Sequence, residues 1–289
     1  MPRARINGID LAYEVHGTGE PVVLVSGTGS PGRVWRTHQV PALKAAGHRV
    51  ITFDNRGLAP DEPGQRSFTL DDMVADLAGL IEHLGAGPCR VVGHSLGGIL
   101  VQELLVARPE LVRQAVLIAS GGRTDEVVRA MAAADLALAD SGITLPPVYA
   151  AFVTALQNLS PRTLNDGALL RDWLTVFELL GVDPAAVRGQ LPVGQIPDRL
   201  PAYRTVRRPC LVVAFRDDLV IRPHLSREVA DAIPGARYRE LADCGHYGHL
   251  ERPEALNELV LDFFAGREPG AAGGALPVDA AREPVPGRR

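Results

Sequence analysis

The chain of 289 residues has three cysteines, one lysine and no apolar run long enough to span a membrane. Cys89, Cys210 and Cys244 are odd in number and are not spaced as metal ligands or as a disulfide framework. We therefore expect no metal site and a reducing, cytoplasmic location. No charged segment followed by an apolar one opens the chain, so we expect neither a signal peptide nor a membrane anchor.

A strong excess of either charge is also missing. The formal net charge is −4, and Lys44 stands alone among many arginines. This balance gives no indication of a nucleic-acid partner. With 46% hydrophobic residues, the chain is long enough to bury one large core and to carry an inserted subdomain. The oligomeric state stays open.

The apolar pattern predicts an α/β fold. Asn7-Gly8 is a hairpin turn signal that joins two predicted strands, residues 3–7 and 11–16. Short apolar runs then alternate with helical patterns, as in a parallel sheet covered by helices. The further predicted strands are residues 21–25, 49–53, 89–93, 114–119, 209–215 and 236–241. The predicted helices among them are residues 36–46, 99–107 and 70–84, the last preceded by a capping box of Thr69 and Asp72.

Residues 121–203 show helical patterns without convincing strands, and prolines interrupt them. Large apolar side chains recur there at roughly helical spacing, which predicts inner helix faces that are mostly core. These side chains are Tyr149, Phe152, Leu156, Trp173, Val176, Phe177 and Leu180. After residue 265 the chain loses all periodicity, so we predict disorder over residues 266–289.

The sequence GHSLGG at residues 93–98 is the strongest functional signal. It lies between an apolar strand and a helix-forming run, which is the setting of a nucleophile elbow. Glycines two residues on either side of Ser95 allow the strained turn that lifts a hydroxyl out of the sheet. A serine hydroxyl is a weak nucleophile at neutral pH, so it needs a base, and the base needs an acid to orient it. We interpret His94 as a packed neighbour of this turn rather than as a second base.

The base and the acid are expected downstream of the serine. The predicted strand at residues 209–215 leads into Asp217 and Asp218, and a carboxylate at such a strand end faces the catalytic edge of the sheet. After the next strand, His246 follows a glycine on a loop. The order serine, acid, histidine is that of an α/β-hydrolase triad rather than of trypsin-like or subtilisin-like enzymes. Cys244 shares the histidine loop, and we interpret it as a small packing residue.

Over nearly its whole length the chain resembles the α/β-hydrolase superfamily. The motifs that carry the resemblance are GHSLGG at residues 93–98, FDNRG at 53–57, FRDDLVIRP at 215–223 and CGHYGHLERPEALNELVLDFF at 244–264. The resemblance implies an α/β-hydrolase fold, with a mostly parallel eight-stranded sheet flanked by helices and an inserted helical cap. It places the hydrolase core at residues 1–120 and 204–265 and the cap at residues 121–203.

The resemblance also implies the roles of individual residues. Ser95 is the expected nucleophile and His246 the expected base. Asp218 matches the position of the acid better than Asp217, which remains the fallback. No cofactor is expected.

The oxyanion hole is expected to consist of two backbone N–H groups, those of Leu96 and Thr28. The residues at the start of the second donor's loop are Ser26-Gly27 here, where the family commonly has His-Gly. The hydrogen bonds that brace this loop must therefore differ from those of its relatives. The side chains expected to bind substrate are Trp35, Phe152, Trp173, Phe177 and Tyr247.

The leading hypothesis is a cofactor-free serine hydrolase that acts on a small, mainly apolar ester, lactone or thioester through an acyl-enzyme. A small molecule is then the expected partner. A second hypothesis keeps the fold but not hydrolysis: the enzyme forms or cleaves a C–C bond, cyclises its substrate or carries out perhydrolysis. The loops at residues 26–30 and 58–60 resemble those of hydrolase-like proteins in natural-product pathways, which implies a bulky, polyketide-type substrate for this second hypothesis. A third hypothesis is a non-catalytic ligand receptor.

Overall fold

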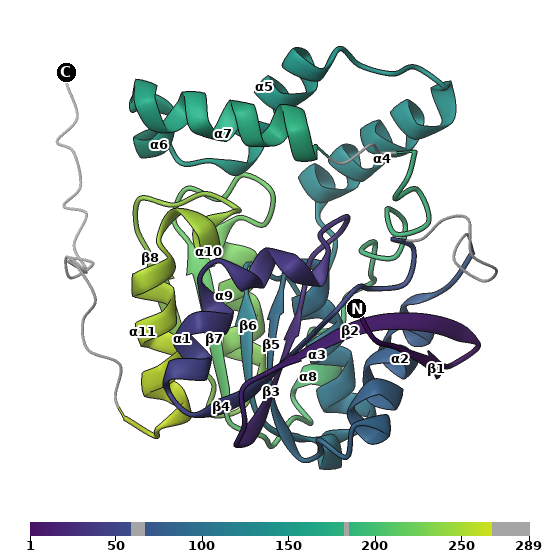
Figure 1. The fold of residues 1–289 in the computed structure, drawn as a ribbon, viewed down its shortest axis with the longest axis vertical. Coiled ribbons are helices and arrows are strands. Elements are labelled where there is room, and N and C mark those ends of the chain that lie inside the picture. The colour runs from purple at the N-terminus through teal and green to yellow at the C-terminus, as the bar shows by residue number, and fades with distance from the viewer. Residues whose placement is uncertain (59–66, 182–184, 268–289) are drawn as a thin grey trace, which may run out of the picture.

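The structure, a computed structural model, describes residues 1–58, 67–181 and 185–267. Its centre is an eight-stranded sheet with the strand order β1-β2-β4-β3-β5-β6-β7-β8 (Figure 1). β1 pairs antiparallel with β2, and β2 with β4, while all other neighbouring strands are parallel. The strands are Arg3–Ile6, Ile9–His16, Glu20–Val25, His48–Phe53, Cys89–His94, Val112–Ile118, Cys210–Phe215 and Arg237–Leu241, numbered β1 to β8. The predicted fold class is confirmed.

Helices cover both faces of this sheet, which explains the apolar character of its central strands. α1 (Gln39–Ala45) and α11 (Pro253–Phe264) pack on one face. The other face carries α2 (Leu70–His83), α3 (Leu96–Ala107), α8 (Leu200–Tyr203) and α9 (Pro223–Ala232). A strand that is covered on both faces has no solvent-facing side, so its apolar and polar residues do not need to alternate. β7, for example, is apolar and buried at every position.

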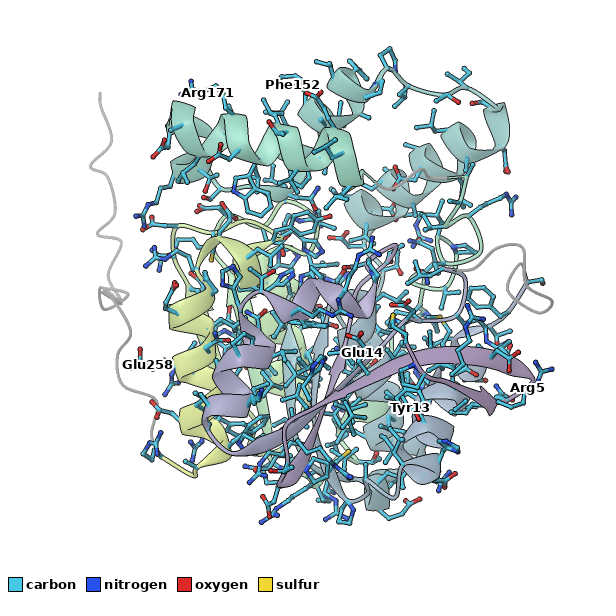
Figure 2. All side chains as sticks on the ribbon, viewed as in Figure 1. Arg5, Tyr13, Glu14, Phe152, Arg171 and Glu258 are labelled. Atoms are coloured by element: carbon cyan, nitrogen blue, oxygen red, sulfur yellow. The ribbon has the colours of Figure 1, made fainter. Side chains whose placement is uncertain are left out.

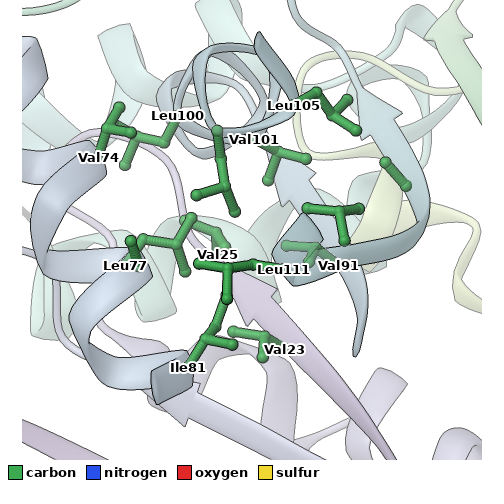
Figure 3. Packing of buried hydrophobic residues seen from close by; sticks show 14 of the residues in the cluster. Val23, Val25, Val74, Leu77, Ile81, Val91, Leu100, Val101, Leu105 and Leu111 are labelled. Atoms are coloured by element: carbon green, nitrogen blue, oxygen red, sulfur yellow. The ribbon is translucent and has the colours of Figure 1, made fainter. Parts of the chain in front are cut away.

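Successive side chains of β3 point to opposite faces, as the two-residue period of a strand requires. Val23 and Val25 belong to the cluster under α2 and α3, whereas Val22 and Leu24 belong to the cluster under α1 and α11. Figure 3 shows the first cluster at close range. Its labelled helix residues are Val74, Leu77, Ile81, Leu100, Val101 and Leu105, beside Val23, Val25, Val91 and Leu111.

Local sequence signals fix the ends of two helices. Thr69 and Asp72 form the predicted capping box at the start of α2, with Oγ1 of Thr69 accepting from the N–H of Asp72 at 3.2 Å. The predicted helix over residues 36–46 is instead a short 3₁₀ helix, η1 (Gly32–Arg36), followed by α1. Pro41 explains the break, because a proline ring excludes the carbonyl of the residue four positions earlier from a continuous helix.

The part of the chain described between β6 and β7 forms five helices, of which α8 packs on the sheet and Figure 1 shows the other four as a layer above it. They are α4 (Glu126–Ser141), α5 (Pro147–Asn158), α6 (Pro161–Asn165) and α7 (Gly167–Leu180). We keep the name cap for residues 121–203, and the division into cap and core stays a proposal.

The inner face of α5 differs from the prediction. Ala151, Ala155 and Leu159 pack against Phe177 of α7, whereas Phe152 keeps half of its surface exposed. Tyr149, Leu156, Val176 and Leu180 are exposed as well. Small alanine side chains let two helices approach closely, so the alanine stripe of α5 rather than its aromatic stripe faces α7.

Gly266 and Arg267, the last described residues, continue from α11 and form backbone hydrogen bonds with it. The N–H of Gly266 donates to the carbonyl of Phe263, and the N–H of Arg267 donates to that of Asp262. Residues 268–289 of the predicted tail lie outside the described residues, as do residues 59, 60 and 184. Among the helices that are described, none has the length and hydropathy needed to cross a membrane.

Candidate active site

Ser95 lies at a sharp turn where β5 leads directly into α3. Its φ of 55° and ψ of −120° fall in a region that residues with a side chain rarely adopt. Two glycines make this turn possible. A Cβ on Gly93 would lie 2.3 Å from the carbonyl oxygen of Gly97, and a Cβ on Gly97 would lie 2.2 Å from that of Val25. Both positions therefore exclude every residue except glycine.

A chain of hydrogen bonds connects Ser95 to His246 and Asp218. Oγ of Ser95 lies 3.0 Å from Nε2 of His246, and Nδ1 of His246 lies 2.8 Å from Oδ2 of Asp218. The carboxylate can only accept, so Nδ1 carries the proton and Nε2 is left to accept from the serine hydroxyl. This arrangement can remove a proton from Ser95 and hold the resulting imidazolium.

Asp218, and not Asp217, faces the histidine. Asp218 follows β7 and is almost completely buried. Its second oxygen, Oδ1, accepts from the N–H groups of Val220 and Ile221, both at 2.8 Å. These two bonds fix the carboxylate, so Oδ2 has one orientation toward His246. Burial raises the pKa of Asp217, whose backbone N–H bonds to the carbonyl of Cys244.

Two further buried histidines lie behind His246: His94 packs against His246, and His249 packs against His94. The ring of His94 lies 4.8 Å from that of His246 and 4.3 Å from that of His249. Nε2 of His94 lies 2.9 Å from the carbonyl oxygen of His246, so this nitrogen must be the protonated one. Burial lowers the pKa of His94 well below its usual range, with smaller contributions from His249 and His246. A neutral His94 can thus orient the loop of His246 without competing with it for a proton.

The two expected oxyanion donors come from the residue after Ser95 and from the loop after β3. Leu96 is the first residue of α3, where backbone N–H groups have no partner within the helix. Thr28 is exposed in the loop after β3, and this loop touches the serine, because a Cβ on Gly27 would lie 3.0 Å from Cβ of Ser95. A carbonyl oxygen between the two N–H groups could take negative charge there.

Ser26, which stands where the family commonly has a histidine, holds the loop after β3 through its own hydrogen bonds. Its Oγ accepts from Nε1 of Trp35 at 2.9 Å, and its carbonyl oxygen accepts from the side-chain amide of Asn55 at 2.8 Å. Trp35 is fully buried in the core, so it has no surface to offer a substrate. Its expected role in substrate binding is corrected: Trp35 braces the loop of Thr28 through Ser26.

Aromatic rings extend from the cap to His246. The ring of Trp173 lies 5.3 Å from that of Phe177, which lies 6.0 Å from that of Tyr247, and Tyr247 lies 6.2 Å from His246. Three of the five side chains expected to bind substrate thus lie together next to the candidate base. Phe152 does not join them: Figure 2 shows it at the outer side of the cap, away from the sheet.

The cap holds the loop of His246 through α5 and α6. The carboxylate of Glu251 accepts from the N–H and Oγ of Ser160, from Oγ1 of Thr163 and from the N–H of Gly245. The N–H of Tyr247 donates to the carbonyl of Asn158 at 3.1 Å. These contacts attach the start of α6 to the residues on both sides of His246.

Sequence reasoning missed Glu251, although it lies inside the quoted segment of residues 244–264. Its position five residues after His246 is a local signal that could have found it. It also missed Gln190, which contacts the loop of Thr28 from 161 positions away. No spacing in the sequence could have indicated that contact.

The described residues contain no group of three or more His, Cys, Asp or Glu side chains arranged to hold a metal ion. All three cysteines are buried and free. Burial raises the pKa of the Cys244 thiol, which makes this neighbour of His246 a poor nucleophile.

Comparisons with known proteins identify the family of the chain. Residues 22–259 match the profile of the Alpha/beta hydrolase family. A Mycobacterium tuberculosis protein named non-heme bromoperoxidase BpoC is 49% identical over 258 residues, which cover 89% of this chain and 98% of the relative. The crystal structure of BpoC has a TM-score of 0.86 at 48% identity, and the match covers 89% of this chain and 96% of that one.

Two other relatives are more distant. An Azorhizobium caulinodans protein named carbamate hydrolase RutD is 30% identical over 275 residues, covering 91% of this chain and 98% of the relative. The crystal structure of the enol-lactonase from Burkholderia xenovorans has a TM-score of 0.79 at 25% identity, covering 91% of this chain and 100% of that one. The profile match and the identity to BpoC both extend over most of the chain, and the chain therefore belongs to the alpha/beta hydrolase family of enzymes.

Proposed function

We propose that this enzyme is a cofactor-free serine hydrolase of small, mainly apolar esters, lactones or thioesters. One observation carries the proposal: Oγ of Ser95, the imidazole of His246 and the carboxylate of Asp218 form a continuous hydrogen-bonded chain. A serine in a strained, glycine-flanked turn next to a buried, oriented histidine is the arrangement that nucleophilic catalysis requires.

The proposed reaction has two halves. His246 takes the proton of Ser95 as Oγ attacks the substrate carbonyl, and the N–H groups of Leu96 and Thr28 bind the oxygen that becomes negative. His246 then gives this proton to the leaving alcohol or thiol, which leaves an acyl-enzyme. In the second half His246 deprotonates a water molecule, the hydroxide attacks the acyl carbonyl, and the proton returns to Oγ of Ser95 as the acid departs. Asp218 stabilises the imidazolium in both halves.

The surroundings of the site support a small, apolar acyl group. Tyr247 presents its aromatic ring to His246, and the rings of Phe177 and Trp173 continue from it into the cap. The names of two relatives, a carbamate hydrolase and an enol-lactonase, describe cleavage of a bond at a carbonyl carbon. Because the relatives are named as enzymes, a catalytic role is favoured over that of a receptor. The three free, buried cysteines support a proposed cytoplasmic location.

Turnover of a panel of p-nitrophenyl esters and simple lactones by the wild type and by Ser95→Ala tests the proposal. We expect turnover by the wild type, a preference for acyl chains without charge, and a loss of at least about 10⁴-fold in Ser95→Ala. Equal turnover by the two proteins would contradict a covalent mechanism.

The 49% identity to BpoC favours perhydrolysis as a second candidate. Hydrogen peroxide would replace water as the acyl acceptor, so the acyl-enzyme would release a peracid and regenerate Ser95. The peracid could then oxidise bromide. Bromination of monochlorodimedone in the presence of acetate, peroxide and bromide measures this activity. A bromination rate that is unchanged in Ser95→Ala would exclude the acyl-enzyme as its source.

A further inference from the structure

Gln190 bridges two loops of the candidate active site from a distant part of the chain. It lies in the last part of the cap, between α7 and α8, and its side chain is completely buried. Oε1 of Gln190 accepts from the N–H of Gly29 at 2.8 Å, and Nε2 donates to the carbonyl oxygen of Arg56 at 2.6 Å. Gly29 follows Thr28 in the loop after β3, and Arg56 lies in the loop after β4.

The chemistry of both contacts requires an amide at this position. A backbone N–H needs an acceptor and a carbonyl oxygen needs a donor, so the two partners fix which end of the amide faces which loop. A carboxylate offers only acceptors, and a thioether of the same length offers no strong donor or acceptor. The stem of Gln190 lies against Gly57, where an added Cβ would approach Cγ of Gln190 to 3.0 Å. Gly57 also adopts a φ of +93°, so the approach depends on a glycine for two reasons.

The bond to Gln190 acts at the part of the loop that carries Thr28. Ser26, at the start of the loop, is already held by Trp35 and Asn55. Gly29 adopts a φ of +68° and is buried, so its N–H would have no access to water if Gln190 moved. The N–H of Gly29 belongs to the peptide unit that directly follows the Cα of Thr28. Fixing that unit restricts the backbone rotation of Thr28 and with it the direction of the loop at the expected oxyanion donor.

We propose that Gln190 is a positioning residue of the oxyanion hole, which it sets by tying the loop of Thr28 to the cap segment between α7 and α8. This inference rests on the proposed function, because it assigns Gln190 a role in stabilising the same oxyanion. If Gln190 has this role, the position of the Thr28 N–H depends on how the cap segment that carries Gln190 packs against the core.

Three variants test this role. Gln190→Met keeps the length and removes both hydrogen bonds, and Gln190→Asn keeps the amide but shortens its reach by one methylene group. Gln114→Met is the matched control, because the amide of Gln114 also joins two elements, bonding Arg90 and the carbonyl of Phe263. Gln114 lies in β6 near the opposite end of the sheet from Ser95.

We expect a loss in kcat rather than in substrate binding. A misplaced oxyanion donor should lower kcat of Gln190→Met for a p-nitrophenyl ester by about 10- to 100-fold, with KM within about threefold of the wild type. Gln190→Asn should lose less, and Gln114→Met should stay within about twofold of the wild type at a temperature where all variants are folded. Hydrogen exchange should be faster in residues 26–30 of Gln190→Met than in those of the wild type or of Gln114→Met.

Each contrary outcome has a distinct meaning. Unchanged exchange in residues 26–30 of Gln190→Met would overturn the brace, whatever the activity. Faster exchange with an unchanged kcat would overturn the role in catalysis, as would an equal loss of kcat in Gln114→Met. If the wild type had no turnover dependent on Ser95, the proposed function would fail, while the exchange measurement would still decide whether Gln190 holds the loop.

Discussion

His249 should make the stability of the folded protein depend on pH in the acid range. Its ring is buried between those of His94 and Trp35, at 4.3 Å and 5.2 Å, and its Nδ1 has no hydrogen-bond partner among the described residues. Burial, followed by the nearby His246 and His38, lowers the pKa of His249 to about 3. A histidine of the unfolded chain has a pKa near 6.5, so between this pH and pH 3 the side chain is protonated in the unfolded state but neutral in the folded state. The contribution of this group to stability is complete above pH 6.5 and is lost progressively as the pH falls toward 3.

The size of the effect follows from the two pKa values. A pH of 5 is about 1.5 units below the pKa of histidine in the unfolded chain, and each unit corresponds to about 1.4 kcal/mol. The free energy of unfolding therefore falls by about 2 kcal/mol between pH 8 and pH 5. His249→Phe keeps a ring of similar shape and cannot titrate. The loss of stability between pH 8 and pH 5 should therefore be smaller in this variant than in the wild type by about 2 kcal/mol. His94, whose pKa is lowered mainly by burial and to a smaller extent by His249, remains in both proteins, and its own contribution is nearly the same in both.

Urea unfolding at pH 5, 6, 7 and 8, extrapolated linearly to water, measures this difference. His83→Phe, which removes an exposed histidine at the end of α2, controls for the loss of a titratable side chain at the surface. Stability curves of the wild type and of His249→Phe that run parallel from pH 8 to pH 5 would refute the reasoning.

Three further predictions concern the site itself. Asp218→Asn should lower kcat for an ester by about 10⁴-fold, because the imidazole loses its oriented acceptor, whereas Asp217→Asn should change kcat by less than about threefold. Steady-state kinetics measures both values, and similar losses in the two variants would contradict the assignment of Asp218 as the acid. The free energy of unfolding in urea should be about 1 kcal/mol higher for Ser95→Gly than for Ser95→Ala, because glycine relieves the strained φ of 55°. Equal free energies of unfolding would mean that the turn stores no strain. Glu251→Gln should destabilise the fold by about 1 to 3 kcal/mol, because an amide cannot accept all four hydrogen bonds of the carboxylate; an unchanged melting temperature would show that this attachment of the cap contributes nothing.

The sequence predicted those features that depend on neighbours along the chain. The central strands β3 to β7 each contain a short apolar run, and the capping box of Thr69 and Asp72 spans four residues, so both follow from local chemistry. The turn at Ser95 depends on glycines two residues away, and the motif that contains them is continuous. The family resemblance favours Asp218 over Asp217 as the acid, and the structure places Asp218 against His246.

Side-chain directions set by tertiary packing could not be predicted in this way. Trp35 follows the loop of Thr28 closely in sequence, yet its indole turns into the core to bond Ser26. α5 has two apolar stripes, and only the fit against α7 decides that Ala151 and Ala155 lie inside while Phe152 lies outside. The amide of Gln190 contacts a loop 161 positions away, where no periodicity connects the two.

The central claim is that Ser95 is an activated nucleophile, and labelling by a serine-directed fluorophosphonate tests it most directly. Intact-protein mass spectrometry should show one adduct on the wild type, none on Ser95→Ala, and greatly slowed labelling of His246→Ala, because the base that removes the hydroxyl proton is missing. A wild type that stays unlabelled, or an adduct that persists in Ser95→Ala, would contradict the account.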